Sequence, residues 1–430
     1  MYSAKIVSRR RAQLERALGD TLPRGLVEYS TEEVKEFRFE RFANLFDKHG
    51  KRTRELTPEE DAFVLNEQLL GKIDYRYFAE RYSTINIAGQ ATGSLYPLFE
   101  SQVLILAEIG RVEFDRVEAE HPDGVCVDIL KARQLGASSL SVSILAHRTL
   151  THSNVFSLIC SDVPDNADFL FDMYERTLDN LPWYLMPTVA ERVKNDEIAY
   201  ATGTRVFHGA SKSTRGADKS GRNATDGAKG NLGRGKTLSV VHQSEIATWT
   251  NPSQIDTALE PAIAVSPMTF WIKESTAQGR GTKNWWYNEW QLAKSGKSRA
   301  IGVFIPWYAE RSKYTLPAPV NWSPSEATVT HARRAEENGP RWMHRPVHLT
   351  RNQLYWYEKT RSEKESKGLL AEFLQEYPAD DEEAFQYSGQ AQVVSPLVLA
   401  RVRDQARPIV SMIEVLPQRE VTAWRPSSQA

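Results

Sequence analysis

The chain has 430 residues, of which 41% are apolar and 25% charged, and this composition excludes a disordered or fibrous protein. The formal net charge is −1, so any contact with nucleic acid has to come from a local basic patch. No apolar stretch approaches the ~18 residues that span a membrane, and the basic N-terminus lacks the apolar core of a secretory signal. The two cysteines, Cys126 and Cys160, stand in apolar runs and predict buried, reduced thiols in a cytosolic protein.

The first 85 residues predict an N-terminal helical region. Apolar residues follow helical spacing over 8–18 and 56–70. Thr57, followed by Pro58 and Glu60, is typical of the start of a helix.

From about residue 95, short β-rich runs alternate with helical stretches. Several runs are apolar on both faces, as strands of a parallel sheet covered by helices are, and the alternation indicates an α/β fold. The predicted strands are 125–130, 155–160, 204–207, 238–243, 268–273 and 301–306. Beyond about residue 325 the chain becomes charged and helical. The segment 210–237 is rich in Gly, Ser, Lys and Arg, and we expect a basic surface loop there.

The segment 125–140 has the order of a phosphate-binding loop: a buried strand, a glycine turn, and a helix whose free N–H groups face phosphates. Aligned with GxxxxGK[ST], Gly136 takes the second glycine position and Ser138 the hydroxyl position, which would hold Mg²⁺. Lys131 stands at the first glycine and Ala137 at the usual lysine, so Lys131, beside Arg133, is the candidate to reach the β- and γ-phosphates. A strand, a turn and a helix occur in every α/β protein, so a purely structural turn is the alternative. The predicted ATP-binding residues of the loop are Lys131, Ala132, Arg133, Gln134, Leu135, Gly136, Ala137, Ser138 and Ser139.

An apolar strand over 238–243 leads to Ser244 and Glu245, about a hundred residues after the loop. ATPases of this type end a core strand with an acidic pair, in which the first acid holds Mg²⁺ and the second polarises the attacking water. Glu245 fits the general base. Ser244 replaces the usual aspartate and offers only a hydroxyl to the metal. The alternative is an ordinary glutamate at a strand end.

The next strand, 268–273, runs into Glu274, Ser275 and Thr276. Small hydroxyl residues at a strand end beside the γ-phosphate can report hydrolysis to the rest of the protein. We therefore predict a coupling segment, with a polar turn as the alternative.

Together and in this order, KARQLGAS, VVHQSEIA and ESTAQG resemble the variant Walker A, Walker B and coupling motifs of phage terminase large subunits. The resemblance covers about residues 80–390. It implies a P-loop NTPase core, RecA-like or ASCE-like, with a mostly parallel central sheet flanked by helices. The expected regions are an N-terminal helical region (1–85), the ATPase core (86–325) and a helical lid or linker subdomain (326–430). The family also places the loop lysine at the start of the loop and a serine before the Walker B glutamate, as Lys131 and Ser244 do here.

Two further positions follow from the resemblance. Family members carry an Arg-Gly pair about ten residues before the Walker B glutamate that acts on the ATP of a neighbouring subunit, and Arg234 matches this position. An arginine there would neutralise the charge that develops on the γ-phosphate. The family holds adenine with a glutamine near an aromatic residue, and Gln102 fits, with Phe99 or Tyr96 nearby. A solvated loop arginine and an ordinary surface glutamine are the alternatives.

The family further carries a C-terminal RNase H-like nuclease, which needs several carboxylates around two metals. Residues 377–389 resemble the end of the ATPase half, and the chain stops about forty residues later. The acidic run 380–383 stands at a helix start and predicts a capped, solvated turn. We therefore expect the nuclease to be missing from a truncated chain.

The resemblance implies an ATP-hydrolysing motor, with ATP and Mg²⁺ as cofactors, that moves double-stranded DNA into a procapsid. Its implied partners are double-stranded DNA, a portal protein and a small terminase subunit. The subunits would form a homo-oligomeric ring, expected to be pentameric, on the procapsid, with a monomer in isolation. The expected location is the host cytoplasm and, transiently, the procapsid, with no place in a membrane. The segment 210–237 is a candidate to contact DNA phosphates in the pore.

Two other functions stay open. Another P-loop nucleic-acid motor, such as a helicase, would need a second RecA-like unit, for which the residues after 306 are too helical. A non-catalytic nucleotide-binding adaptor with a degenerate loop is suggested by Ala137 and Ser244.

Overall fold

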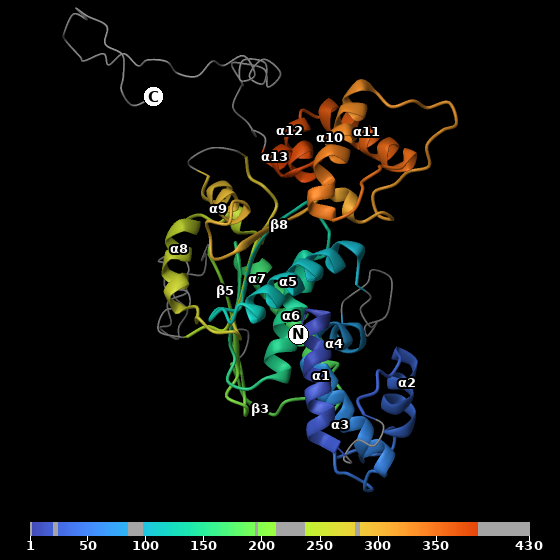
Figure 1. Cartoon of the computed structure of the whole chain (residues 1–430), viewed down its shortest axis with the longest axis vertical. Coiled ribbons are helices and arrows are strands. Elements are labelled where there is room, and N and C mark those ends of the chain that lie inside the picture. The colour runs from blue at the N-terminus through green and yellow to red at the C-terminus, as the bar shows by residue number, and fades with distance from the viewer. Residues whose placement is uncertain are drawn as a thin grey trace, which may run out of the picture. The chain divides into compact units, whose positions relative to one another are not determined.

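Eight strands form one mixed sheet in the order β3-β4-β5-β2-β6-β7-β1-β8 (Figure 1). The computed structural model describes residues 2–19, 25–84, 98–193, 197–211, 237–279 and 284–385. Contacts divide the chain into Met1–Ser388 and Gly389–Ala430, and the second unit lies outside the described residues. The strands are β1 Val125–Lys131, β2 Phe156–Ser161, β3 Val189–Val193, β4 Glu197–Tyr200, β5 Arg205–Ala210, β6 Val240–Ser244, β7 Phe270–Ser275 and β8 Ile301–Ile305.

The sheet is parallel from β5 to β8 and antiparallel only where β3 and β4 extend one edge. β7 lies between β1 and β6. Since the parallel strands run in one direction, β1, β2, β6 and β7 all end at the same edge of the sheet. Open α/β sheets bind their ligands at this edge.

Helices precede, flank and follow the sheet. The N-terminal helices are α1 Ala4–Leu18, α2 Thr31–Glu36 with a π-helical turn Phe37–Arg41, α3 Pro58–Ile73 and α4 Tyr75–Tyr82. Those around the sheet are α5 Glu100–Glu118, α6 Ala137–Thr151, α7 Pro164–Asp179, α8 Pro252–Leu259 and α9 Trp285–Lys294, with 3₁₀ turns at Ile246–Thr248, Glu260–Ala262 and Trp307–Ala309. The C-terminal helices are α10 Glu326–Met343, α11 Arg351–Ser366, α12 Leu370–Glu376 and α13 Asp381–Ala384.

The two faces of the sheet bury separate hydrophobic clusters. Side chains alternate between the faces along each strand. On β1, Val127 and Ile129 join the cluster under α5, α6 and α7, whereas Cys126 and Leu130 join the cluster under α8 and α9. Figure 1 shows α6 on one side of the strands and α8 and α9 on the other. Lys131 belongs to the α6 face by the same alternation.

The N-terminal helices pack on the buried helix α6. The hydroxyl of Tyr75 donates to Ser143 Oγ at 3.0 Å, and a ring nitrogen of His147 lies 2.7 Å from the carbonyl oxygen of Gly71. α3 begins with the predicted cap, in which Thr57 and Glu60 each accept from the other's backbone N–H. This region therefore supports the helix whose first turn meets the pocket.

The predicted α/β fold class, with a mostly parallel sheet flanked by helices, is confirmed. All six predicted strands are present, displaced by no more than two residues at the start and three at the end. The pair β3–β4 was not among them. Cys126 and Cys160 are free and buried, as predicted. None of the described helices has the length and apolar character needed to cross a membrane.

The prediction of a solvated turn at 380–383 is wrong in one respect. Asp380 does cap α13, but Asp380, Asp381 and Glu383 are buried. Distant cations explain their burial. Arg334 pairs with Asp380, and Lys294 lies 2.6 Å from Asp381. A ring nitrogen of His331 lies 3.2 Å from Glu383.

Candidate active site

The loop between β1 and α6 depends on one glycine. Gly136 caps α6 with φ of +73°, a left-handed conformation that L side chains rarely adopt. A Cβ on Gly136 would also come within 2.6 Å of Gln102 Nε2. Gln134 is left-handed as well, with φ of +54°. The loop therefore turns sharply enough to direct the N–H groups at the start of α6 toward the strand ends.

Hydrogen bonds from two sides hold this loop. From α5, Ser101 donates to Leu135 O at 2.8 Å, and Gln102 Nε2 donates to Gly136 O at 2.9 Å. From the segment after β8, Tyr314 donates to Arg133 O at 2.5 Å, and Lys313 donates to Gln134 O. Gln102 is fully buried and engaged with the loop, so its role in holding adenine stays a prediction.

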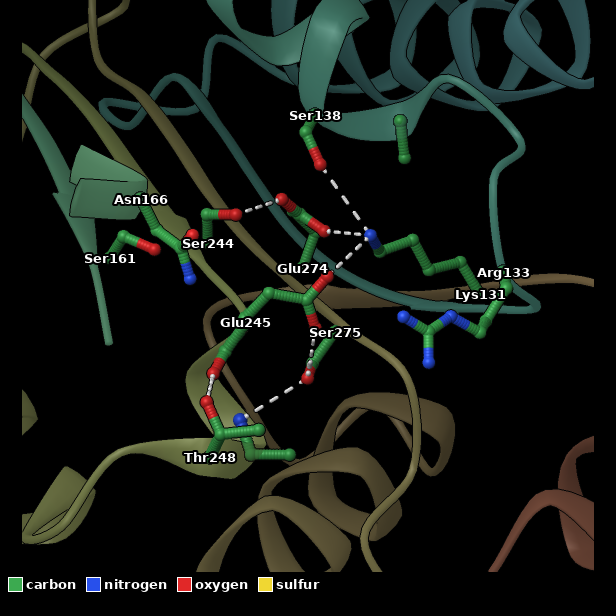
Figure 2. Close-up of polar contacts among 12 residues, drawn as sticks. Lys131, Arg133, Ser138, Ser161, Asn166, Ser244, Glu245, Thr248, Glu274 and Ser275 are labelled. Carbon is green, nitrogen blue, oxygen red and sulfur yellow. Dashed lines mark hydrogen bonds and ion pairs between the residues drawn. The ribbon is translucent and has the colours of Figure 1, made fainter. Parts of the chain in front are cut away.

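Lys131 ends β1 and places its ammonium among three oxygen-bearing side chains (Figure 2). Its Nζ lies 2.8 Å from Glu274 Oε2, 2.9 Å from Glu245 Oε1 and 3.5 Å from Ser138 Oγ. Burial opposes the charge of Lys131, but Glu274 and Glu245 raise its pKa above the ordinary lysine value. Burial likewise opposes ionisation of Glu274, but the Lys131 ammonium lowers the pKa of that carboxyl below its usual range. The site therefore holds a charged lysine paired with ionised carboxylates.

The strand register brings Ser244 and Glu274 together. They are direct partners across β6 and β7, so their side chains leave the sheet on the same face. Ser244 Oγ donates to Glu274 Oε1 at 2.6 Å, and a ring nitrogen of His242 lies 3.3 Å from the same oxygen. Glu274, predicted as part of the coupling segment, is thus a central, fully buried carboxylate of the site.

Glu245 follows β6 in a left-handed conformation, with φ of +51°. Non-glycine residues in this conformation store strain, and such strain is concentrated at functional sites. The Glu245 side chain is about one-third exposed, so water can reach it. Ser275 Oγ donates to Glu245 Oε2 at 3.4 Å, and Thr248 Oγ1 donates to the Glu245 carbonyl oxygen at 2.8 Å.

A pocket of about 500 Å³ opens at these strand ends. Most of the predicted residues line it. From the loop and α6 these are Lys131, Arg133, Gln134, Leu135, Gly136, Ala137, Ser138 and Ser139, and from the strand ends Ser244, Glu245 and Thr276. Ala132 is buried beneath the loop, and Glu274 and Ser275 are buried directly behind the pocket wall. Arg234 and Tyr96 lie outside the described residues, as does nearly all of the segment 210–237.

One wall of the pocket was not predicted. It comes from the end of β2 and from α7, and its members include Asp162, Asn166, Phe169 and Met173. Asp162 accepts from Asn166 at 2.7 Å and from Thr248 at 3.1 Å. Burial raises the pKa of the Asp162 carboxyl, but these hydrogen bonds outweigh it and lower the pKa. No motif marks these residues, but their position after a predicted buried strand was a usable signal.

The described residues contain no group of three or more His, Cys, Asp or Glu side chains arranged to hold a metal ion. Mg²⁺ bound with a nucleotide needs fewer, because it takes one or two protein oxygens together with phosphates and water. Ser138 and Glu274 fit that requirement, since their oxygens already surround a cation, the Lys131 ammonium.

No protein-family model matches the chain, and the curated proteins include no match. Similar solved structures are large terminases of bacteriophages. For the HK97 large terminase, 13% of residues are identical over 69% of this chain and 52% of that one, with a TM-score of 0.41. For the large terminase of a thermophilic bacteriophage the values are 13%, 59%, 54% and 0.35, and for the Thermus phage P74-26 large terminase ATPase domain 13%, 63%, 92% and 0.34. Other structures of the thermophilic bacteriophage protein are complexes with ADP and with ATP-gamma-S. The chain thus matches about half the length of that protein and of the HK97 protein.

Proposed function

We propose that this chain is an ATPase that binds ATP with Mg²⁺ at the pocket between the 131–139 loop and the ends of β6 and β7. One observation carries the proposal: Lys131, Ser138 and Glu245 meet at the carboxyl edge of the sheet, against the first turn of α6. A helix N-terminus with free N–H groups attracts phosphate. A buried lysine and a strand-end carboxylate beside it are what phosphoryl transfer to water requires.

Each side chain then has a distinct role. The N–H groups at the start of α6 and the Lys131 ammonium hold the β- and γ-phosphates. Turning toward the phosphates takes the Lys131 ammonium away from Glu245 Oε1, which is 2.9 Å away in this structure. The released carboxylate accepts a proton from the attacking water as general base. Bound Mg²⁺ would supply electrostatic stabilisation of the phosphate oxygens, held by Ser138 and Glu274.

Contacts between the site and the C-terminal helices support a coupling role for the segment after β7. Ser275 contacts the carboxylate of Glu245, and the backbone N–H of Gly279 donates to Gln375 Oε1 at 3.1 Å. The neighbouring Glu376 pairs with Arg133 of the loop at 2.5 Å. The end of α12 therefore contacts both the loop and the segment after β7, so a change at either one reaches the helices.

The motif order extends the proposal to a DNA-packaging motor of the terminase type. The chain would act in a homo-oligomeric ring on a procapsid, with double-stranded DNA, a portal protein and a small terminase subunit as partners. Arg234 of a neighbouring subunit would complete the site, and residues 210–237 would contact DNA phosphates. The active form would work in the host cytoplasm, and cutting of DNA would require a nuclease elsewhere in the protein. An isolated subunit would hydrolyse ATP slowly.

Replacing the proposed base tests the ATPase assignment. Glu245→Gln keeps the size of the side chain and removes its basicity, so we expect the hydrolysis rate per subunit to fall by ~10²- to 10⁴-fold. Affinity for a non-hydrolysable ATP analogue should stay within a few-fold of the unmodified chain. Hydrolysis is measured with duplex DNA at concentrations where subunits assemble. Glu260→Gln, an exposed residue away from the pocket, is the matched control.

Three results would count against the proposal. Unchanged hydrolysis in Glu245→Gln would remove Glu245 from the reaction. Nucleotide binding without hydrolysis by the assembled, unmodified chain would favour the non-catalytic adaptor. ATP-dependent strand separation of a DNA duplex would favour a helicase over a packaging motor.

A further inference from the structure

The acidic strand end lacks one carboxylate, and Glu274 lies beside the place where it is missing. The first position of the expected acidic pair is Ser244, whose hydroxyl donates to Glu274 Oε1 at 2.6 Å. Ser244 and Glu274 are partners across adjacent strands and share one face of the sheet. The carboxylate therefore stands one strand nearer to the loop than the usual position.

A cation already lies between this carboxylate and the loop. The Lys131 ammonium is 2.8 Å from Glu274 Oε2 and 3.5 Å from Ser138 Oγ (Figure 2). Carboxylate and hydroxyl oxygens are also the ligands that Mg²⁺ takes in proteins. The side chains of β7 and α6 therefore form a position in which positive charge is stabilised.

Nucleotide binding would change the charge balance at this position. Lys131 has to turn toward the phosphates, and Glu274 is fully buried. It would keep only the Ser244 hydroxyl and the His242 ring on Oε1. A buried carboxylate without a counter-ion is strongly unfavourable. A divalent cation that arrives with the phosphates removes this cost.

We infer that Glu274 supplies the protein carboxylate to the Mg²⁺ of the bound nucleotide, in place of the aspartate absent at Ser244. Before the nucleotide binds, Lys131 holds the place of that cation. Ser244 and His242 are positioning residues, because their contacts with Oε1 leave Oε2 directed at Lys131 and Ser138. This inference rests on the proposed function.

The measurement that tests it is the dependence of nucleotide affinity on Mg²⁺. The affinity for a non-hydrolysable ATP analogue is measured by calorimetry with Mg²⁺ and again with a chelator, and the ratio of the two is compared between variants. In Glu274→Gln we expect the ratio to fall by at least ~10-fold, the usual cost of disturbing a metal site. The affinity in chelator should stay the same or rise, since the variant removes a carboxylate that competes for Lys131.

Two further variants separate metal binding from a structural role. Glu289→Gln alters a carboxylate that pairs with Lys273 at 3.1 Å on the opposite face of the sheet, and it should keep the unmodified ratio. The double variant Ser244→Asp with Glu274→Ser moves the carboxylate back across the register pair, and it should regain most of the ratio lost in Glu274→Ser. Thermal melting of each variant establishes that it is folded.

The outcomes distinguish the two levels of the proposal. If Glu274→Gln keeps the unmodified ratio, or if the folded double variant regains none of it, the assignment of Glu274 is wrong while the ATPase proposal stands. If the unmodified chain binds no nucleotide with or without Mg²⁺, the proposed function fails and this inference falls with it.

Discussion

Two lysines are buried on opposite faces of the same part of the sheet, each among carboxylates. Lys131 faces α6 and pairs with Glu274 and Glu245 at 2.8 and 2.9 Å. Lys273 faces α8 and α9, and its carboxylate neighbours are farther away. These are Glu289 at 3.1 Å, Asp128 at 3.5 Å and Asp256 at 3.7 Å.

The two clusters differ in charge balance and in access. Glu245 is partly exposed and lines the pocket, so the cluster around Lys131 can exchange its cation for a ligand. The cluster around Lys273 has three carboxylates for one lysine and does not border that pocket. Burial raises the pKa of Asp128 to about 7, with Glu289 and Asp256 adding to the rise and Lys273 opposing it. The first cluster is arranged for exchange, and the second joins β1, β7, α8 and α9.

The largest effect on stability is expected from Lys273→Met. The substitution leaves three carboxylates without their cation, and breaking a buried ion pair in this way costs ~3–5 kcal/mol. Urea unfolding followed by circular dichroism measures this loss. The matched control is Lys131→Met, which strands one fully buried carboxylate, Glu274, that still accepts from Ser244. We expect the control to lose less stability but to lose most of its affinity for nucleotide. A larger loss of stability in Lys131→Met would contradict the contrast between the two clusters.

Asp128 gives a pH-dependent test of the enclosed cluster. Its pKa rises from 3.8 to about 7 on folding, so between these values the folded chain holds a proton that the unfolded chain has lost. The contribution of Asp128 to stability therefore falls as pH rises from about 4 to 7 and is level above that range. Asp128→Asn removes this dependence. Between pH 5 and pH 8 the variant should gain on the order of 2 kcal/mol relative to the unmodified chain.

The free energy of unfolding in urea at the two pH values measures this gain. Asp115→Asn, an exposed substitution on α5, is the control and should follow the unmodified chain at both values. Parallel pH profiles for Asp128→Asn and the unmodified chain would mean that Asp128 ionises as freely in the folded state as in the unfolded state.

The same contrast shows how far the sequence reaches. Apolar runs and turn residues were enough to predict six strands, the loop at 131–139 and Glu245, because each depends on local pattern. The position of Glu274 beside Ser244 depends on how β6 pairs with β7, and register is decided by strands packing together rather than by either strand alone. The burial of Asp380 and Asp381 likewise depends on Arg334 and Lys294, which come from other helices.

The smallest effect is expected from Glu376→Gln, at an ion pair that solvent reaches. Arg133 is more than half exposed in its pair with Glu376, so the loss of stability should stay below about 1 kcal/mol. The backbone N–H of Arg133 still donates to the Glu376 carbonyl oxygen, so the loop keeps its anchor. Releasing the guanidinium frees a cation that lines the pocket, and we expect the affinity for an ATP analogue to rise a few-fold. Titration calorimetry measures it, with Glu372→Gln, an exposed residue of α12, as control. Weaker binding in Glu376→Gln would instead mean that the ion pair positions the loop, which would give this exposed pair a role shared with the buried contacts of Lys131.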